Sequence, residues 1–233
     1  MDILLITGTQ HHGVTHKIKE FIISELASGN KIPEFVLPKD GPTFCTGCKT
    51  CFYKDETLCP HADKVMPIWK AMLEADLILF VYPTYVMRAP AQVKALLDHL
   101  ACHWMPHRPE PRLFDKQVAI IAQSLGAPTF GALRDVKVSM NWMGISSVKS
   151  LRLKLMNHAE WDLLSAKRRA SIEARTRAFA QRFKRLQPAK KSLKHHAIFM
   201  MCRTLQQNLL KKMGPSTADL RHWLDKGWIR NQG

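Results

Sequence analysis

Short apolar runs that alternate with helical stripes constrain the fold of this chain more than any other feature. The run from Leu77 to Tyr82 (LILFVY) is the strongest of them, and Pro83 ends it. Four further strands are predicted, at residues 3–7, 34–37, 118–122 and 147–155. Between the strands, apolar residues recur at three- and four-residue spacing, which predicts amphipathic helices. The alternation predicts an α/β fold in which a doubly wound sheet of five parallel strands has helices on both faces.

The basic residues are concentrated in the last third of the chain. Residues 1–148 hold 15 Lys and Arg against 14 Asp and Glu, whereas residues 149–233 hold 20 against 5. Beyond Leu155 the pattern predicts basic helices at about 160–186, 192–213 and 216–226, with breaks at Pro188 and at Gly214-Pro215. We therefore predict a domain over residues 1–155, with a Cys-rich loop at 44–60, followed by a basic helical C-terminal extension over 156–233.

Three interpretations of the extension follow from its charge. Its helix from Leu193 to Met213 is amphipathic with cationic flanks, a pattern that interfacial helices share. We favour a solvated extension that packs on the domain. Peripheral membrane contact through residues 190–213 is the second interpretation, because each basic residue near an anionic bilayer contributes about 1 kcal/mol. Nucleic acid is the least favoured partner, since the segment lacks interleaved aromatic residues and any recognisable reader motif.

The N-terminus and the cysteine content indicate a compartment. The chain opens with MDILLITGTQ, which lacks the basic start of a secretory signal, and it contains no apolar run of membrane-spanning length. We expect a cytoplasmic protein, with peripheral contact at the inner face of the membrane as the alternative. In that compartment, clustered cysteines more often bind metal or carry redox chemistry than form disulfides.

The loop from Gly8 to Thr15, between the first strand and the first helix, is a candidate phosphate site. Backbone N–H groups and the hydroxyls of Thr9 and Thr15 could bind an anion at the helix N-terminus. The loop lacks both the nucleoside-triphosphate pattern and the dinucleotide fingerprint. A phosphate site without a cationic anchor suits a flavin monophosphate, and an ordinary polar turn that bends at Gly8 is the alternative reading.

Two more loops follow strands that would end at the same edge of the sheet. One runs from Pro83 to Met87 and the other from Ser124 to Ala127. Open α/β sheets bind ligands at the carboxyl ends of their strands. Three such loops favour a ligand site at this edge.

The residues of these loops resemble those of the flavodoxin-like NAD(P)H-dependent FMN reductases over about residues 1–155. The specific part is Tyr82-Pro83-Thr84-Tyr85 followed by Pro90-Ala91-Gln92-Val93-Lys94, and Gly8 to Thr15 matches more loosely. The resemblance implies a flavodoxin-like strand order, FMN as cofactor, NAD(P)H as electron donor and a homo-oligomer. No catalytic acid or base is assigned, because hydride transfer to a flavin needs none. The implied FMN-binding residues are Thr9, His11, Gly13, Val14, Thr15, Pro83, Thr84, Tyr85, Val86, Ser124, Leu125 and Gly126.

The cysteines of residues 44–60 follow the pattern Cys45-x2-Cys48-x2-Cys51-x7-Cys59-Pro60. This spacing resembles the bacterial ferredoxin run and fits structural zinc less well. It is also similar to the iron–sulfur flavoproteins, a branch of the same group, and that resemblance implies a [4Fe–4S] cluster held by the four thiols. The alternative is a loop without a cluster, whose thiols pack the loop or shape the flavin site or a dimer interface.

Together these observations predict an FMN-dependent oxidoreductase of the iron–sulfur flavoprotein kind. It would pass electrons between NAD(P)H or a reduced redox protein and a quinone, flavin or protein acceptor. A cluster-free NAD(P)H:quinone or FMN reductase is the alternative within enzymes. A non-catalytic electron carrier or binding flavoprotein, docked through its basic tail, is the alternative from another class.

Overall fold

A computed structural model describes residues 1–186, 189 and 192–231. Five parallel strands form one sheet in the order β2-β1-β3-β4-β5, which is the flavodoxin-like order, so the predicted fold is confirmed. The strands are β1 (Ile3–Thr7), β2 (Glu34–Val36), β3 (Leu77–Pro83), β4 (Gln117–Ser124) and β5 (Ser147–Lys154). All seven residues of β3 and all eight of β4 are buried, as expected for central strands covered on both faces.

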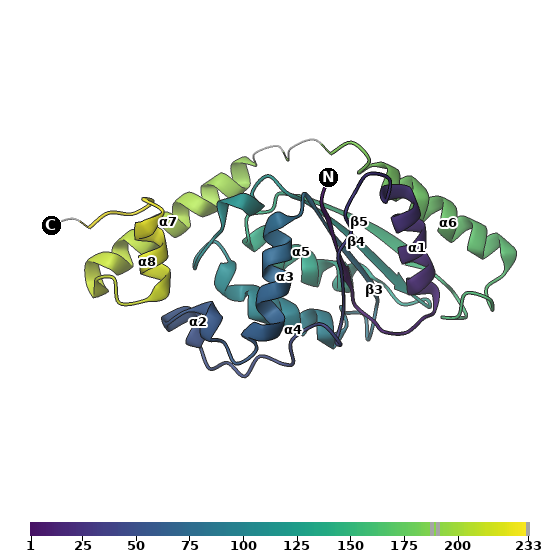
Figure 1. Cartoon of the computed structure of the whole chain (residues 1–233), viewed down its shortest axis with the longest axis horizontal. Coiled ribbons are helices and arrows are strands. Elements are labelled where there is room, and N and C mark those ends of the chain that lie inside the picture. The colour runs from purple at the N-terminus through teal and green to yellow at the C-terminus, as the bar shows by residue number, and fades with distance from the viewer. Residues whose placement is uncertain (187–188, 190–191, 232–233) are drawn as a thin grey trace.

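Helices cover both faces of the sheet (Figure 1). Successive residues of β1 point to opposite faces of the sheet. Ile3 and Leu5 pack in the core beneath α1 and α6, and Leu4 and Ile6 pack in the core beneath α3, α4 and α5. The helices along this part of the chain are α1 (Val14–Leu26), α2 (Thr50–Tyr53), α3 (Ala62–Glu74), α4 (Ala91–His99), α5 (Phe130–Trp142) and α6 (Ala166–Gln181). Short 3-10 turns lie at Glu56–Leu58, Leu100–His103 and Pro111–Leu113.

The first helix of the basic extension is shorter than predicted at both ends, since it ends at Gln181 and not near 186. α6 begins at Ala166, later than the expected start near 160, because Ser165 caps the helix by accepting a hydrogen bond from the Arg168 N–H. Residues before it form an irregular segment beside α1. The prediction that Pro188 separates two helices falls outside the described residues, as do residues 190 and 191 of the proposed membrane-contact stretch.

The last two helices, α7 (Leu193–Met213) and α8 (Ala218–Asp225), lie at the opposite end of the molecule from α6 (Figure 1). They form a separate small core with Met105, in which Trp223 is completely buried. The rings of Phe199 and Trp228 lie 5.2 and 5.0 Å from that of Trp223. The extension is therefore packed on the domain, as the favoured interpretation of its sequence predicts. None of the described helices is both long enough and apolar enough to cross a bilayer.

Candidate functional site

The three predicted ligand loops leave β1, β3 and β4, which are neighbours in the sheet. Hydrogen bonds tie the loops together: the Gly8 N–H donates to Val81 O at 2.8 Å, and the Thr84 N–H donates to Gln123 O at 2.7 Å. A Cβ on Gly8 would lie 2.6 Å from Tyr82 Cβ, so the first loop can cross β3 this closely only as glycine. The fold thus brings the predicted residues to one edge of the sheet.

The first loop presents the N-terminus of α1, where Gly13 precedes the first helical residue. Thr9 Oγ1 accepts a hydrogen bond from the His11 N–H at 3.2 Å, and Thr15 Oγ1 accepts one from the Gln123 side-chain amide at 3.0 Å. Both hydroxyls that were predicted to bind phosphate are therefore hydrogen-bonded within the protein. The positive end of the α1 dipole favours an anion at this point.

A segment between β5 and α6 covers part of this first loop. The Val14 N–H donates to Ala159 O at 2.8 Å, and the exposed His11 ring lies 2.8 Å from a Glu160 carboxylate oxygen. A phosphate that used the Val14 N–H would have to displace the Ala159 carbonyl. The sequence did not predict that residues 159 and 160 lie over the first loop, because no local pattern links them to it.

The second loop is a tight turn whose backbone is strained. Tyr85 and Arg88 exchange backbone hydrogen bonds of 3.0 and 2.9 Å. The two residues between them, Val86 and Met87, have φ angles of 49° and 61°. A β-branched residue at positive φ is costly, and such strain clusters at ligand sites. Asp135 holds the turn in place by accepting hydrogen bonds from the Arg88 side chain and the Ala89 N–H.

Thr84, at the base of this turn, carries the clearest sign of a missing partner. Its Oγ1 is buried, and no group in the described part of the chain hydrogen-bonds to it. Leaving a buried hydroxyl unsatisfied costs about 1–3 kcal/mol, which a bound ligand would recover. The residues at this edge therefore fit a ligand that offers a hydrogen-bonding group to Thr84.

The third loop is shaped by its own serine. Ser124 is buried, and its hydroxyl donates to Ala127 O at 2.6 Å, while its carbonyl accepts the Leu155 N–H at 2.8 Å. Leu125 is exposed, and a Cβ on Gly126 would meet no atom within 4 Å. Ser124 thus fixes the loop, and the open side near Gly126 is left for a ligand.

The four cysteines of the Cys-rich loop are all free thiols, spread over α2, the turn after it and the segments that flank them. Cys45 and Cys48 are exposed, and Cys59 Sγ lies 4.0 Å from His99 Nδ1. Burial raises the pKa of Cys59, and the charges of the other three thiolates raise it further. A hydrogen bond with Cys102 lowers the pKa of Cys51 to about 7, with help from the Arg108 cation.

These thiols are not assembled around one point. Within residues 1–186, 189 and 192–231, no three His, Cys, Asp or Glu side chains are gathered in an arrangement that could hold a metal ion. The loop as folded therefore does not fit a [4Fe–4S] cluster without rearrangement.

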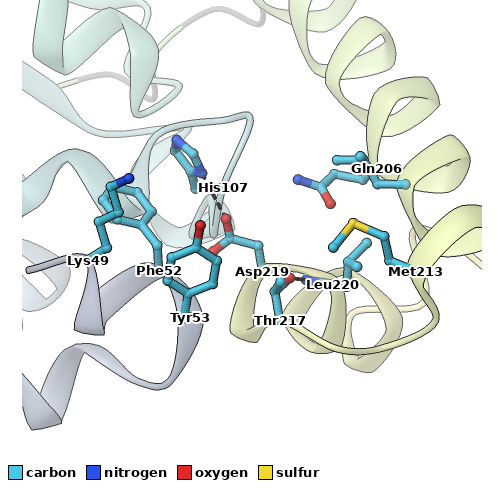
Figure 2. A pocket seen from close by; sticks show the side chains of 10 residues that line it. Lys49, Phe52, Tyr53, His107, Gln206, Met213, Thr217, Asp219 and Leu220 are labelled. Carbon is cyan, nitrogen blue, oxygen red and sulfur yellow. Dashed lines mark hydrogen bonds and ion pairs between the residues drawn. The ribbon is translucent and has the colours of Figure 1, made fainter.

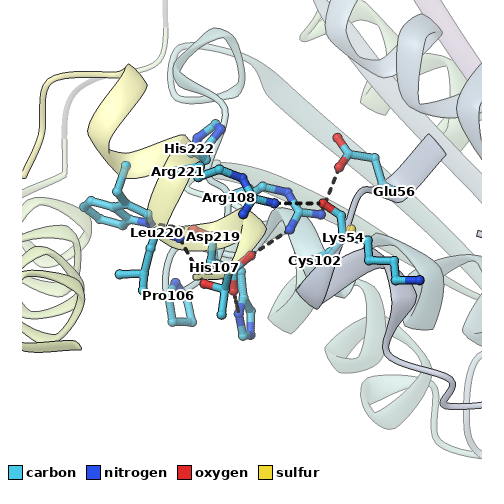
Figure 3. Close-up of polar contacts among 12 residues, drawn as sticks. Lys54, Glu56, Cys102, Pro106, His107, Arg108, Asp219, Leu220, Arg221 and His222 are labelled. Carbon is cyan, nitrogen blue, oxygen red and sulfur yellow. Dashed lines mark hydrogen bonds and ion pairs between the residues drawn. The ribbon is translucent and has the colours of Figure 1, made fainter. Parts of the chain in front are cut away.

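A buried charge network beside the Cys-rich loop was not expected from the sequence (Figure 3). Arg108 is 6% exposed and bridges two acids: Glu56 of the Cys-rich loop at 2.9 Å and Asp219 of α8 at 2.7 Å. His107 Nδ1 lies 2.8 Å from the other Asp219 oxygen. The one sequence feature that could have indicated this network is that Asp219 is among only five acidic residues in residues 149–233. The network joins the Cys-rich loop, the core and the extension.

Residues 1–159 match the family described as NADPH-dependent FMN reductase. An iron-sulfur flavoprotein of Archaeoglobus fulgidus is 26% identical over 106 residues, which is 45% of this chain and 46% of the relative. One of Methanocaldococcus jannaschii is 44% identical over 54 residues, 23% of this chain and 27% of the relative. The matches thus span less than half the length of either curated relative.

Solved structures share the fold at low sequence identity. An azoreductase from Bacillus anthracis is 16% identical, covers 79% of this chain and 98% of its own, and has a TM-score of 0.58. The NAD(P)H:quinone oxidoreductase from Methanothermobacter marburgensis is 13% identical, with 80% and 98% coverage and a TM-score of 0.62. A flavone reductase is 14% identical with a TM-score of 0.61, and it covers 100% of this chain and 99% of its own, so its fold includes the extension.

Proposed function

Because the chain belongs to the NADPH-dependent FMN reductase family, we propose that it is an FMN-dependent NAD(P)H oxidoreductase. FMN, when bound, supplies the hydride-accepting chemistry, and the protein supplies position, electrostatics and access. The observation that carries the proposal is the buried, unpartnered Thr84 hydroxyl beneath a strained turn at the carboxyl edge of the sheet.

The chain's own residues bind and orient in this proposal. Thr9, Gly13 and Thr15 shape the N-terminus of α1 for the phosphate, with His11 and Val14 beside it. Pro83, Thr84, Tyr85 and Val86 form the loop for one side of the ring, and Ser124, Leu125 and Gly126 border it from β4. Asp135 holds the strained turn, which makes it a positioning residue.

The test begins with protein purified without oxygen. We expect a flavin absorption spectrum, release of FMN on denaturation, and oxidation of NADH or NADPH coupled to reduction of a quinone or added flavin. Bound FMN without any NAD(P)H turnover would instead identify an electron carrier. A colourless protein that also refuses added FMN would overturn the proposal.

A second candidate, which requires the Cys-rich loop to rearrange, adds a [4Fe–4S] cluster on Cys45, Cys48, Cys51 and Cys59. It is favoured by the four free thiols on one loop and by the names of the curated relatives. About four irons per chain, with matching acid-labile sulfide, would support this candidate. Cys48→Ser should then remove the iron, whereas Cys202→Ser, buried in the extension, should retain it. Iron-free protein with full flavin content would leave the cluster-free reductase.

The acceptor and the surroundings of the enzyme are also proposals. We propose a small-molecule or protein redox partner, a homo-oligomer, and peripheral contact of α7 with anionic membranes. The last is supported by an outward row on α7 in which Met201 and Leu205 are exposed between Lys194 and Lys212. Cosedimentation with anionic vesicles that survives Met201→Glu and Leu205→Glu would contradict the membrane contact.

A further inference from the structure

A cavity of about 330 Å³ lies between α2 of the Cys-rich loop and helices α7 and α8 of the extension (Figure 2). It is lined by none of the residues assigned to the flavin. Even an apolar cavity of about 150 Å³ holds a benzene ring. The cavity is therefore large enough for a small molecule that carries one aromatic ring.

At the floor of the cavity, the side chain of Gln206 carries a hydrogen-bond acceptor that lacks a donor among the described residues. Gln206 is 3% exposed, and its amide nitrogen donates to Pro106 O at 2.6 Å. That bond fixes the orientation of the amide, because a flipped amide would set two oxygens against each other. Gln206 Oε1 is buried without a partner among the described residues, and in Figure 2 it points toward the space beside Met213. A hydroxyl group would satisfy it.

The other polar groups at the floor already have partners. Asp219 accepts from Arg108 and contacts His107, so its negative charge is compensated. Thr217 Oγ1 accepts the Leu220 N–H as the cap of α8. Gln206 is thus the floor residue that remains to be satisfied.

The walls and the rim indicate what the rest of a ligand would be. Phe52 and Tyr53 stand on one side and Leu209 and Met213 on the other, which suits a flat apolar ring. Lys49 at the rim is exposed and forms no ion pair within the described part of the chain. Its ammonium group, in a chain of net charge +16, favours an anionic group at the mouth.

We propose that this cavity is a binding site for a small hydroxylated aromatic acid. The ring lies between Phe52 and Met213, the hydroxyl donates to Gln206 Oε1, and the carboxylate lies near Lys49. The ligand would bridge the Cys-rich loop and the extension. The site is separate from the flavin loops, and its occupation does not depend on the proposed reductase activity.

The probe is 4-hydroxybenzoate, titrated calorimetrically into the flavin-loaded full-length protein. We expect it to bind about tenfold more tightly than benzoate, which lacks the donor, and than 4-hydroxybenzyl alcohol, which lacks the charge; tenfold corresponds to about 1.4 kcal/mol. The flavin absorption spectrum should not change on binding. Equal affinity for the three compounds, or no binding because water alone fills the cavity, would overturn the proposal.

Two variants separate the contacts. Gln206→Leu should abolish the preference for 4-hydroxybenzoate over benzoate. Lys49→Met, at an exposed position that should not affect folding, should abolish the preference over the neutral alcohol, and Lys70→Met on the exposed face of α3 is the matched control. A ligand-induced flavin shift that Lys49→Met leaves unchanged would assign the binding to the flavin edge and overturn the proposal.

Discussion

Helix α6 and the α7–α8 pair both come from the basic last third of the chain, yet different kinds of contact hold them to the domain. α6 contributes Phe179, and the turn that follows it contributes Phe183, to the same apolar core as α1. At the surface, Glu25 of α1 forms ion pairs with Arg177 and Lys184. The α7–α8 pair has its own aromatic core around Trp223, and Asp219 of α8 pairs with the buried Arg108, which also pairs with Glu56. α6 thus packs directly on one face of the sheet. The α7–α8 pair is instead held by the small aromatic core around Trp223 and by the buried ion pair with Arg108.

The largest expected effects come from removing one aromatic residue from each core. Phe183 and Trp223 are both completely buried, and replacing either by alanine should cost about 3–5 kcal/mol. Phe183→Ala should lower the free energy of unfolding of the whole domain, whereas Trp223→Ala should release only α7–α8. Urea unfolding followed by circular dichroism, with limited trypsin digestion, distinguishes the two. If Trp223→Ala shifts the entire transition as Phe183→Ala does, the two regions unfold as one unit.

The charge network should be nearly as sensitive. Arg108→Met leaves Glu56 and Asp219 without their buried cation, and breaking such a pair costs about 3 kcal/mol. Arg88→Met is the control, because the Arg88 side chain is 67% exposed and its ion pair with Asp135 is screened by water. We expect trypsin to cleave the extension faster only in Arg108→Met. Similar behaviour of both variants would mean that burial of the network contributes little.

Mild acid should weaken the α7–α8 attachment first. Burial lowers the pKa of His103 to about 3 and also lowers that of His222, so the unfolded chain binds protons that the folded chain does not. Stability is complete above about pH 6.5 and falls below it, by up to about 1.4 kcal/mol per pH unit for His103.

The α6 attachment should respond only at lower pH. Hydrogen bonds from Lys184 and Arg177 lower the pKa of Glu25, so its contribution persists until the pH falls below the ordinary carboxyl range near 4. Proteolysis of the α7–α8 segment alone should therefore accelerate between pH 6.5 and 5, and His103→Leu should reduce that change. A digestion rate that stays constant over this range would contradict the assignment.

The smallest expected effect concerns the flavin edge, which belongs to the same domain as α6. Thr84→Val removes a buried hydroxyl that has no partner among the described residues, so the flavin-free protein should become more stable, while FMN binds about tenfold more weakly, a difference of about 1.4 kcal/mol. Thr176→Val is the matched control, because Thr176 Oγ1 is also buried without a partner in the described part of the chain but lies on α6. Fluorescence titration with FMN measures both. Equal loss of affinity in the two variants would remove Thr84 from the site.

The sheet was predictable because its signals are local. The run from Leu77 to Tyr82 became β3, and Pro83 closes the strand as expected. The loops after β1, β3 and β4 were predictable as neighbours, because parallel strands place their carboxyl ends at one edge. The resemblance to the FMN reductases, confirmed by the family match, rests on those same loops.

What the sequence did not reveal depends on residues that are distant along the chain. The Ala159 carbonyl on the Val14 N–H, and the pairing of Arg108 with Glu56 and Asp219, have no spacing pattern that could announce them. The spacing of the four cysteines likewise does not reveal that Cys51 interacts with Cys102 or that Cys59 lies beside His99.

The amino-acid sequence by itself determined the strands, their parallel arrangement and the place of the three loops after β1, β3 and β4, because hydrophobic periodicity and turn residues act over a few neighbouring positions. Only the tertiary structure decided how the basic third divides between α6 and α7–α8, and which polar groups are left without partners. Those outcomes follow from desolvation, and a side chain's loss of water is set by whatever the rest of the fold places against it.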